Sequence, residues 1–172
     1  MNETLRTLIR RSSCRQFLDK EIPEDALNEI VEAGLYAPTA MGRQESAAIV
    51  ITNKKVINDL EEVNAKVMGR NGHPFYGAPV VILIIAKGPT AIYDGSAMIM
   101  NMLNAAESLN IGSCWIHRAK EELETEFGRK LLEENGFDSN EYVGIGHVIL
   151  GYRSYEPKER APRKEGRAIY IK

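Results

Sequence analysis

The sequence predicts a single domain over residues 1–172 that contains both helices and strands. Two stretches rich in β-branched and other apolar residues, 47–52 and 79–86, have the length and composition of strands. Between them, residues 54–67 carry apolar side chains at helical spacing. A chain of 172 residues is long enough for one domain with a substantial hydrophobic core.

Two helices are expected before the first strand. Asn2 or Thr4 can cap a short helix that leads directly into an arginine-rich stretch. Pro23 suits the first turn of a second helix, and Pro38 ends it. The apolar residues that recur at helical spacing are Leu5, Leu8 and Ile9 in the first helix and Leu27, Ile30, Val31 and Leu35 in the second.

The second half of the chain continues the alternation of helices and strands. Residues 79–86 form the most apolar stretch, which predicts a central strand buried on both faces. The helix expected next is apolar most of the way round, so it belongs in the core or at an interface. That helix spans 93–109 and is closed by Gly112. A strand at 113–116, a helix at 121–135 and a strand at 142–151, interrupted by Gly144 and Gly146, follow. The chain ends in a strand-like segment at 168–171, which we expect to pair with a sheet edge of this or another subunit.

Composition excludes several classes of partner. The formal net charge is -2 and the basic residues are spread along the chain, which does not indicate a nucleic-acid or membrane-surface partner. No apolar run has the length of a membrane-spanning helix, and the N-terminus lacks the apolar core of a signal peptide. Two cysteines are too few for a disulfide framework. We therefore expect a cytoplasmic protein with reduced thiols and no metal centre.

The first candidate site is the arginine segment, residues 10–17, with the sequence R-R-S-S-C-R-Q-F. Three guanidinium groups and two hydroxyls lie within six positions there. The planar guanidinium fork matches phosphate oxygens, so the segment indicates an anion site. A solvated basic face is the alternative. Apolar residues on both sides of the segment favour a fixed loop that holds a ligand.

Two further loops contain candidate residues. Residues 37–46 include small side chains that let a ligand approach the backbone, together with the hydrogen-bonding Thr39, Arg43 and Gln44. A plain connector is the alternative there. His73, in a loop at 69–74, has the chemistry of a catalytic acid or base. Because no acidic or cysteine partner lies near it in the sequence, a structural or binding role is favoured.

In their order, these stretches resemble the FMN-dependent nitroreductase family in a short form. The family begins with a pattern close to R-x-S-x-R-x-F, and residues 11–17 read R-S-S-C-R-Q-F. The resemblance implies that Arg11, Ser13 and Arg15 hold the phosphate, ribityl chain and pyrimidine edge of FMN. Ser12 would contribute through its backbone.

A second family signature is similar to A-P-S-A-x-N-x-Q-P-W, and residues 37–46 read A-P-T-A-M-G-R-Q-E-S. In the family this loop comes from the neighbouring subunit and covers one side of the flavin, which implies contacts from Pro38, Thr39 and Ala40. Gly42 stands where asparagine is usual, and Glu45-Ser46 replaces Pro-Trp. These departures affect the expected substrate more than the cofactor.

Later segments extend the resemblance along the chain. Residues 109–116, L-N-I-G-S-C-W-I, are similar to a family segment that passes the flavin ring. Residues 144–152 resemble the last family strand with its Gly-Tyr ending. The further residues implied in cofactor binding are Asn71, Ser113, Cys114 and Trp115 at the ring, and Arg163 or Lys164 at the phosphate.

The resemblance implies an α+β fold: a three-layer sandwich whose mostly antiparallel sheet of four or five strands is flanked by helices, in an intertwined homodimer. It implies an FMN-dependent oxidoreductase that passes hydride from NADH or NADPH through bound flavin to a nitroaromatic, quinone or similar small acceptor. No side chain is assigned as a general acid or nucleophile. The alternatives are a reductive dehalogenase or small-substrate dehydrogenase of the same fold, a flavin-binding protein without turnover, and an interaction domain without a cofactor.

Overall fold

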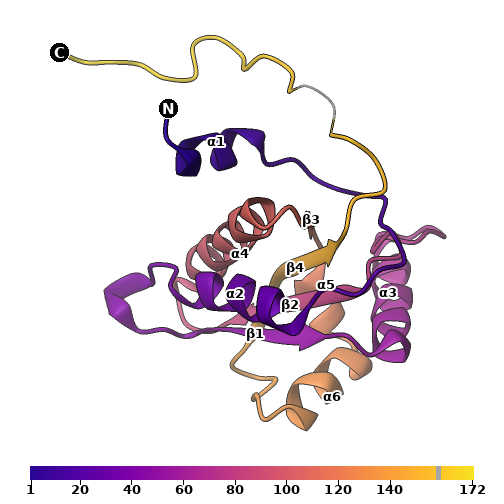
Figure 1. Cartoon of the computed structure of the whole chain (residues 1–172). Coiled ribbons are helices and arrows are strands. Elements are labelled where there is room, and N and C mark those ends of the chain that lie inside the picture. The colour runs from indigo at the N-terminus through magenta and orange to yellow at the C-terminus, as the bar shows by residue number, and fades with distance from the viewer. Residues whose placement is uncertain (158–159) are drawn as a thin grey trace.

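The computed structural model describes residues 1–157 and 160–172, and its centre is a four-stranded antiparallel sheet (Figure 1). The strands lie in the order β1-β2-β4-β3. Their bounds are Ser46–Ile51 for β1, Val80–Ala86 for β2, Gly112–Ile116 for β3 and Val143–Gly151 for β4. Because β3 lies at an edge, its outer side is available to pair with another segment.

Every residue of β2 is buried, as expected for a central strand. Successive side chains of a strand point to opposite faces, so β2 contributes to two separate cores. Val80, Ile82 and Ile84 belong to one apolar cluster, and Val81, Leu83 and Ile85 belong to the other. The predicted burial of this strand on both faces is confirmed.

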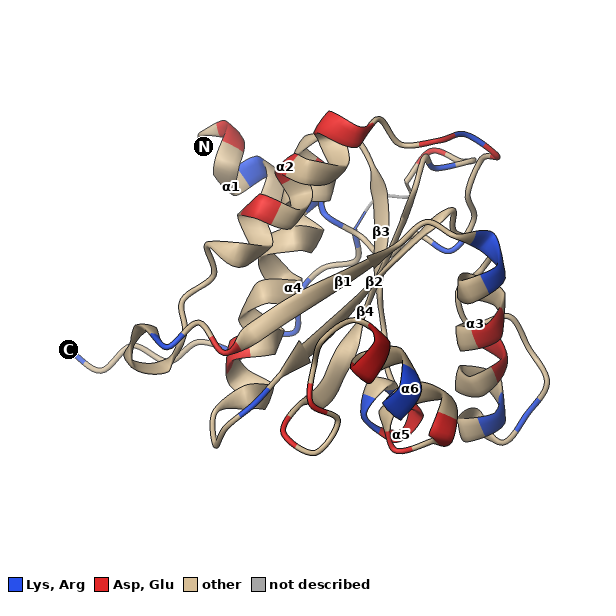
Figure 2. Ribbon diagram, turned by 90° about the horizontal axis from the view of Figure 1, so that it is seen from below, with Lys and Arg blue, Asp and Glu red and all other residues tan. Residues whose placement is uncertain are grey.

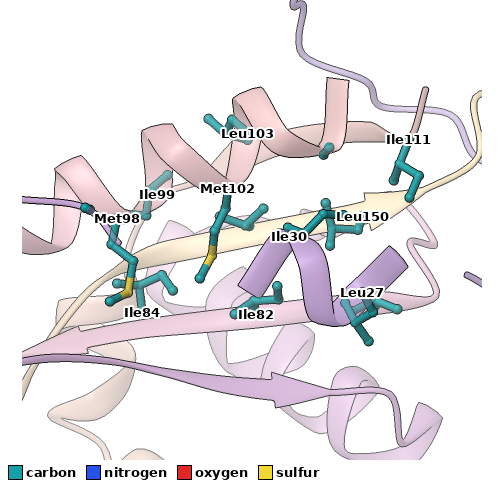
Figure 3. Packing of buried hydrophobic residues seen from close by; sticks show 14 residues of the cluster. Leu27, Ile30, Ile82, Ile84, Met98, Ile99, Met102, Leu103, Ile111 and Leu150 are labelled. Atoms are coloured by element: carbon teal, nitrogen blue, oxygen red, sulfur yellow. The ribbon is translucent and has the colours of Figure 1, made fainter. Parts of the chain in front are cut away.

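Helices α1, Glu3–Arg10, α2, Glu24–Leu35, and α4, Ala91–Ser108, lie on one side of the sheet (Figure 1). Figure 3 shows α2 and α4 directing their apolar side chains toward β2 and β4. Gly34 permits the close approach of the two helices, since a Cβ atom there would lie 2.3 Å from Cε of Met102. A short 3-10 turn, Ala40–Gly42, follows α2.

Helices α3, Lys54–Met68, α5, Ala119–Leu123, and α6, Glu126–Glu134, pack on the other side and complete three layers. One helix was expected over 121–135, and this prediction is wrong because the chain turns at Glu124 and Thr125. The Thr125 hydroxyl accepts a hydrogen bond of 3.1 Å from the Gly128 N–H and starts α6. A Cβ at Gly128 would lie 2.2 Å from the Glu122 carbonyl oxygen, so only glycine allows this tight corner.

Contrary to the expectation from the sequence, Gly112 does not end α4, and Gly144 and Gly146 do not interrupt β4. Asn110, with φ of 57°, is the left-handed residue after α4, whereas Gly112 already belongs to β3. A Cβ at Gly112 would lie 2.8 Å from Sγ of Cys14, so this glycine provides room for packing. Strand β4 runs through Gly144 and Gly146 with a shift of register opposite Ile84 and Ile85.

The C-terminal segment leaves the body of the protein after β4 (Figure 1). Within the described residues, 168–171 form no strand, and Ile169, Tyr170 and Ile171 are 85%, 84% and 97% exposed. The expected pairing with a sheet edge is therefore absent within this chain.

Acidic and basic residues are interspersed along α3 (Figure 2). Among the described helices, none combines the length and apolar character needed to cross a membrane.

Candidate functional site

The arginine segment lies against the edge of the sheet. After α1 ends at Arg10, Ser13 forms a parallel bridge with Ser113 of β3, and the Cys14 N–H donates a 2.8 Å hydrogen bond to the Ser113 carbonyl. Phe17 forms an antiparallel bridge with Arg153. These backbone bonds place the predicted residues Arg11, Ser12, Ser13 and Arg15 along the free side of β3.

A cluster of guanidinium groups surrounds the start of this segment. Glu107, which is only 3% exposed, accepts a 2.9 Å hydrogen bond from Nε of Arg10 and also pairs with Arg153. Arg160, from the C-terminal segment, donates to the carbonyl oxygen of Arg11. Burial lowers the pKa of Arg11, the charge of Arg160 lowers it further, and Glu107 opposes the shift. The positive charge at Arg11 and Arg160 thus favours a bound anion.

A cavity of about 460 Å³, called the β3 cavity below, adjoins this segment. It collects four of the predicted site residues from three separate parts of the chain. The described residues that line it include no Asp or Glu. Those with polar or aromatic side chains are Arg15, Arg70, Asn71, His73, Tyr76, Cys114, Trp115, His117 and Arg118.

The loop that carries Asn71 is held by Glu61 of α3. Its carboxylate accepts a 2.7 Å hydrogen bond from the Phe75 N–H and lies 3.2 Å from Nδ1 of His73. Glu61 is the acidic partner of His73 that was not found near it in the sequence. Both contacts fix the loop against α3, which supports a binding or structural role for His73.

Strand β3 supplies the wall of the β3 cavity. Ser113 and Cys114 are buried, and Trp115 is half-buried. The Ser113 hydroxyl has no hydrogen-bond partner within the described parts of the chain. Gly146 of β4 makes room for the indole, because a Cβ there would lie 2.3 Å from Nε1 of Trp115. Of these three predicted residues, Cys114 and Trp115 line the β3 cavity, and Ser113 is not among its lining residues.

The loop with Pro38, Thr39, Ala40 and Gly42 lies elsewhere, on the opposite side of the protein from α3 (Figure 1). Its Ala40 N–H donates a 3.1 Å hydrogen bond to Asp94 of α4, and the Thr39 hydroxyl accepts one of 3.0 Å from the Gln44 N–H. No residue of this loop lines the β3 cavity among those described. Within one chain, the loop and the arginine segment remain apart.

The predicted pair Arg163 and Lys164 is exposed in the C-terminal segment. Arg163 donates to the nearby Ala161 carbonyl. Arg160, three positions earlier, is instead the residue that contacts the arginine segment. Arg160 was not predicted from the sequence, although its place beside Pro162, Arg163 and Lys164 in a basic run offered a signal.

A buried polar network was also missed. Asn64, Glu122 and His147 are each 0% exposed, and they come from α3, α5 and β4. Nε of Arg118 donates a 2.9 Å hydrogen bond to the Asn64 side-chain oxygen. The network thus ends at a residue that lines the β3 cavity. No local pattern could reveal it, because its members are separated by tens of residues.

Comparison with known proteins is consistent with this arrangement. The Nitroreductase family matches residues 8–152 of the chain. A protein from Archaeoglobus fulgidus, provisionally named NADH dehydrogenase/NAD(P)H nitroreductase, is 30% identical over 159 residues, 88% of this chain and 86% of its own. One from Methanothermobacter thermautotrophicus with the same provisional name is 29% identical over 170 residues, 92% of this chain and 81% of its own.

Among solved structures, a nitroreductase with bound FMN from Bacteroides fragilis has a TM-score of 0.90 with this chain. The two are 29% identical, and the similarity covers 100% of each chain. The fold expected from the sequence, an α+β arrangement of this type, is thereby confirmed. Since the family match spans most of the sequence, the protein belongs to the nitroreductase family.

Proposed function

We propose that this protein is an FMN-dependent oxidoreductase that takes electrons from NADH or NADPH and passes them to a nitroaromatic, quinone or similar acceptor. It works as one domain over residues 1–172. The observation that carries the proposal is the meeting of the arginine segment, the Asn71 loop and β3 around the β3 cavity. The FMN bound to the Bacteroides fragilis relative supports the choice of cofactor.

The residues present suit such a cofactor. A phosphate carries close to two negative charges at neutral pH and needs several fixed donors. Arg11 and Arg160 together raise the local positive potential and are suited to hold the phosphate. Arg163 and Lys164 of the C-terminal segment can add to them in an assembled dimer. The buried Ser113 hydroxyl, whose backbone pairs with the arginine segment, is without a hydrogen-bond partner among the described residues.

Bound flavin supplies the hydride chemistry, and the chain supplies position and electrostatics. Arg15 and Asn71, which both line the β3 cavity, would hold the pyrimidine edge. The positive charge of Arg15 stabilises negative charge that develops there on reduction. Cys114 and Trp115 shape the wall, and the half-buried indole limits the access of water.

A homodimer completes the proposed site. Leu5, Leu8 and Ile9 of α1 are about half exposed, at 48%, 47% and 59%, and the terminal Ile169, Tyr170 and Ile171 are more exposed still. Such apolar surface favours burial against a second copy. Since the loop with Pro38, Thr39, Ala40 and Gly42 lies away from the β3 cavity of its own chain, we propose that it covers the cavity of the partner subunit.

We also propose a cytoplasmic location. Cys14 and Cys114 are free, buried thiols. Thiols persist in reducing compartments, where structural disulfides are rare.

Light scattering on the purified protein tests the proposed homodimer, because a dimer has twice the 19.2 kDa mass of the chain.

Paired titrations with FMN and riboflavin test the cofactor proposal. The two ligands share the ring and ribityl chain and differ in the phosphate. We expect Arg11→Gln and Arg160→Gln to weaken FMN binding roughly tenfold each and to leave riboflavin binding unchanged, because each removes a charge-assisted hydrogen bond to phosphate. Lys130→Gln, which removes one positive charge at an exposed position of α6, is the matched control.

Equal loss of both ligands in the arginine variants would place these residues outside a phosphate site. Protein that binds neither ligand would show that the chain shares the family fold without its cofactor. Reduction of the bound flavin by NADH or NADPH, followed by turnover with nitrofurazone or menadione, then tests the electron transfer. Flavin that dithionite reduces and neither nucleotide reduces would instead favour a flavin-binding protein without turnover.

A further inference from the structure

Three members of the polar network behind the β3 cavity, Asn64, Glu122 and His147, are fully buried. The Asn64 amide donates a 3.0 Å hydrogen bond to the His117 carbonyl and a second hydrogen bond to the Glu122 carboxylate. Nε2 of His147 lies 2.8 Å from the other oxygen of that carboxylate. That 2.8 Å approach is not a hydrogen bond in its geometry, and Nδ1 of His147 also has no partner among the described residues. The Asn64 amide, bound to the His117 carbonyl, is therefore the group that fixes the turn after β3.

Arg118 is the residue that this turn presents. Its backbone has φ of 80°, a left-handed conformation that costs a side-chain-bearing residue free energy. Nε donates to Asn64, and the structure gives the two terminal amino groups no further hydrogen bond within residues 1–157 and 160–172. Arg118 is therefore oriented by one edge of its guanidinium while the rest stays available to a ligand.

The charge of the β3 cavity indicates what that ligand is. Arg15, Arg70 and Arg118 line it with His73 and His117, and no acidic residue lies among the described lining residues. Two carboxylates lie behind the lining residues: Glu61, 3.2 Å from Nδ1 of His73, and Glu122, which contacts Arg118 only through Asn64. The proposed flavin contacts use Arg15 and leave the charge of Arg118 without a counterpart. Such a cavity attracts an anionic molecule.

We propose that Arg118 is a specificity-determining residue that binds an anionic oxygen group of the molecule exchanging electrons at the β3 cavity. This inference rests on the proposed function of the same site. The group is a carboxylate of the acceptor or a phosphate of the nicotinamide nucleotide, since guanidinium binds both in the same geometry. Asn64 and Glu122 are positioning residues that act through Arg118.

A matched pair of acceptors tests the proposal. The KM values of 4-nitrobenzoate and of neutral 4-nitrobenzyl alcohol are measured for the wild-type holoenzyme, Arg118→Gln, Arg118→Lys and the control Lys130→Gln. In Arg118→Gln we expect a KM roughly tenfold higher for the anionic acceptor and unchanged for the neutral one. Arg118→Lys retains the charge and is expected to restore part of the preference. The KM of NADH is measured with the neutral acceptor.

Binding provides a second readout that does not need turnover. Trp115 is the only tryptophan of the chain and lines the same cavity, so quenching of its fluorescence reports occupancy directly. Titrations with 4-nitrobenzoate, 4-nitrobenzyl alcohol and NAD⁺ are compared between the wild type and Arg118→Gln. A roughly tenfold weaker affinity confined to 4-nitrobenzoate assigns the anion to the acceptor, and one confined to NAD⁺ assigns it to the nucleotide.

The outcomes separate this inference from the function on which it rests. Protein that lacks FMN and turnover but still loses anion binding in Arg118→Gln would refute the oxidoreductase proposal and leave the anion site standing. Suppose instead that the holoenzyme is active, and that Arg118→Gln leaves the ratio between the anionic and the neutral probe unchanged in both KM and affinity. That result would overturn this inference and leave the proposed function intact. Parallel weakening of the anionic and neutral probes would also overturn it, because it would mean that Arg118 merely shapes the cavity.

Discussion

Nε2 of His147 lies 2.8 Å from a carboxylate oxygen of Glu122, and neither side chain is exposed to solvent. The other carboxylate oxygen accepts from Asn64, so one acidic group connects β4 with α3. The contact between His147 and Glu122 is an ion-pair approach without hydrogen-bond geometry, and Nδ1 of His147 has no partner among the described residues. Such a pair is sensitive to the loss of either member, because the remaining polar group stays buried.

Glu122→Ala should therefore destabilise the fold by about 3–5 kcal/mol, since it leaves His147 and Asn64 buried without their shared partner. Urea unfolding measures the change. The control is Glu134→Ala, which removes an exposed carboxylate 3.7 Å from Lys130 and should cost less than about 1 kcal/mol. Equal costs for the two variants would show that the buried network contributes nothing specific.

Gly144→Ala should cost about 1–3 kcal/mol through overpacking. A Cβ at position 144 would lie 2.2 Å from the Ala119 carbonyl oxygen, and this backbone contact cannot move without shifting α5 from β4. At Gly72 the nearest atom to an added Cβ is Cε of Met68 at 3.5 Å, so Gly72→Ala is the control. Thermal denaturation compares them, and a tolerated Gly144→Ala would contradict the close contact of α5 and β4.

Glu107→Gln should destabilise the protein by about 1–3 kcal/mol, because the buried carboxylate pairs with both Arg10 and Arg153. It should also lower the pKa of Arg11 further, since Glu107 opposes the effects of burial and Arg160 there. Glu29→Gln, an exposed change on α2, is the comparison in urea unfolding. A neutral effect of Glu107→Gln would mean that solvent takes over both guanidinium groups.

A chain that stops after Pro157 should keep its fold and bind FMN more weakly. No described residue of the removed segment is buried, so the melting temperature should change little. The loss of Arg160 removes a positive charge beside Arg11. Single variants Arg160→Gln, Arg163→Gln and Lys164→Gln in the full chain then show which charge matters. A dominant effect of Arg163 or Lys164 would indicate that the segment changes position in the dimer.

Tyr155 supplies a prediction about alkaline pH. Burial raises the pKa of its phenol, and neighbouring Cys14 adds to the rise. A group with a raised folded-state pKa contributes stability below its unfolded pKa and loses it as the pH rises through the folded value. Wild type should thus lose more stability above about pH 10 than Tyr155→Phe. Melting temperatures at several pH values test this, with Tyr170→Phe as the exposed control.

Local patterns in the sequence were sufficient for most elements. The apolar run at 79–86 predicted a strand buried on both faces, and β2, Val80–Ala86, is that strand. The helix expected over 54–67 corresponds to α3, Lys54–Met68, capped by Asn53. Such features are encoded by neighbours in the chain, because side-chain periodicity and capping act over a few residues. The motifs at 11–17 and 109–116 also identified segments that pair side by side.

Tertiary structure decided the features that join distant residues. The turn at Glu124 and Thr125 depends on close packing of Gly128 against α5. Glu61 meets His73, and Arg160 meets Arg11, only when the chain is folded. The path from His147 through Glu122 and Asn64 to Arg118 joins β4, α5 and α3. The sequence by itself determined most of the elements and the arginine segment. These contacts required the fold, because long-range contacts leave no periodic signal in the residues that make them.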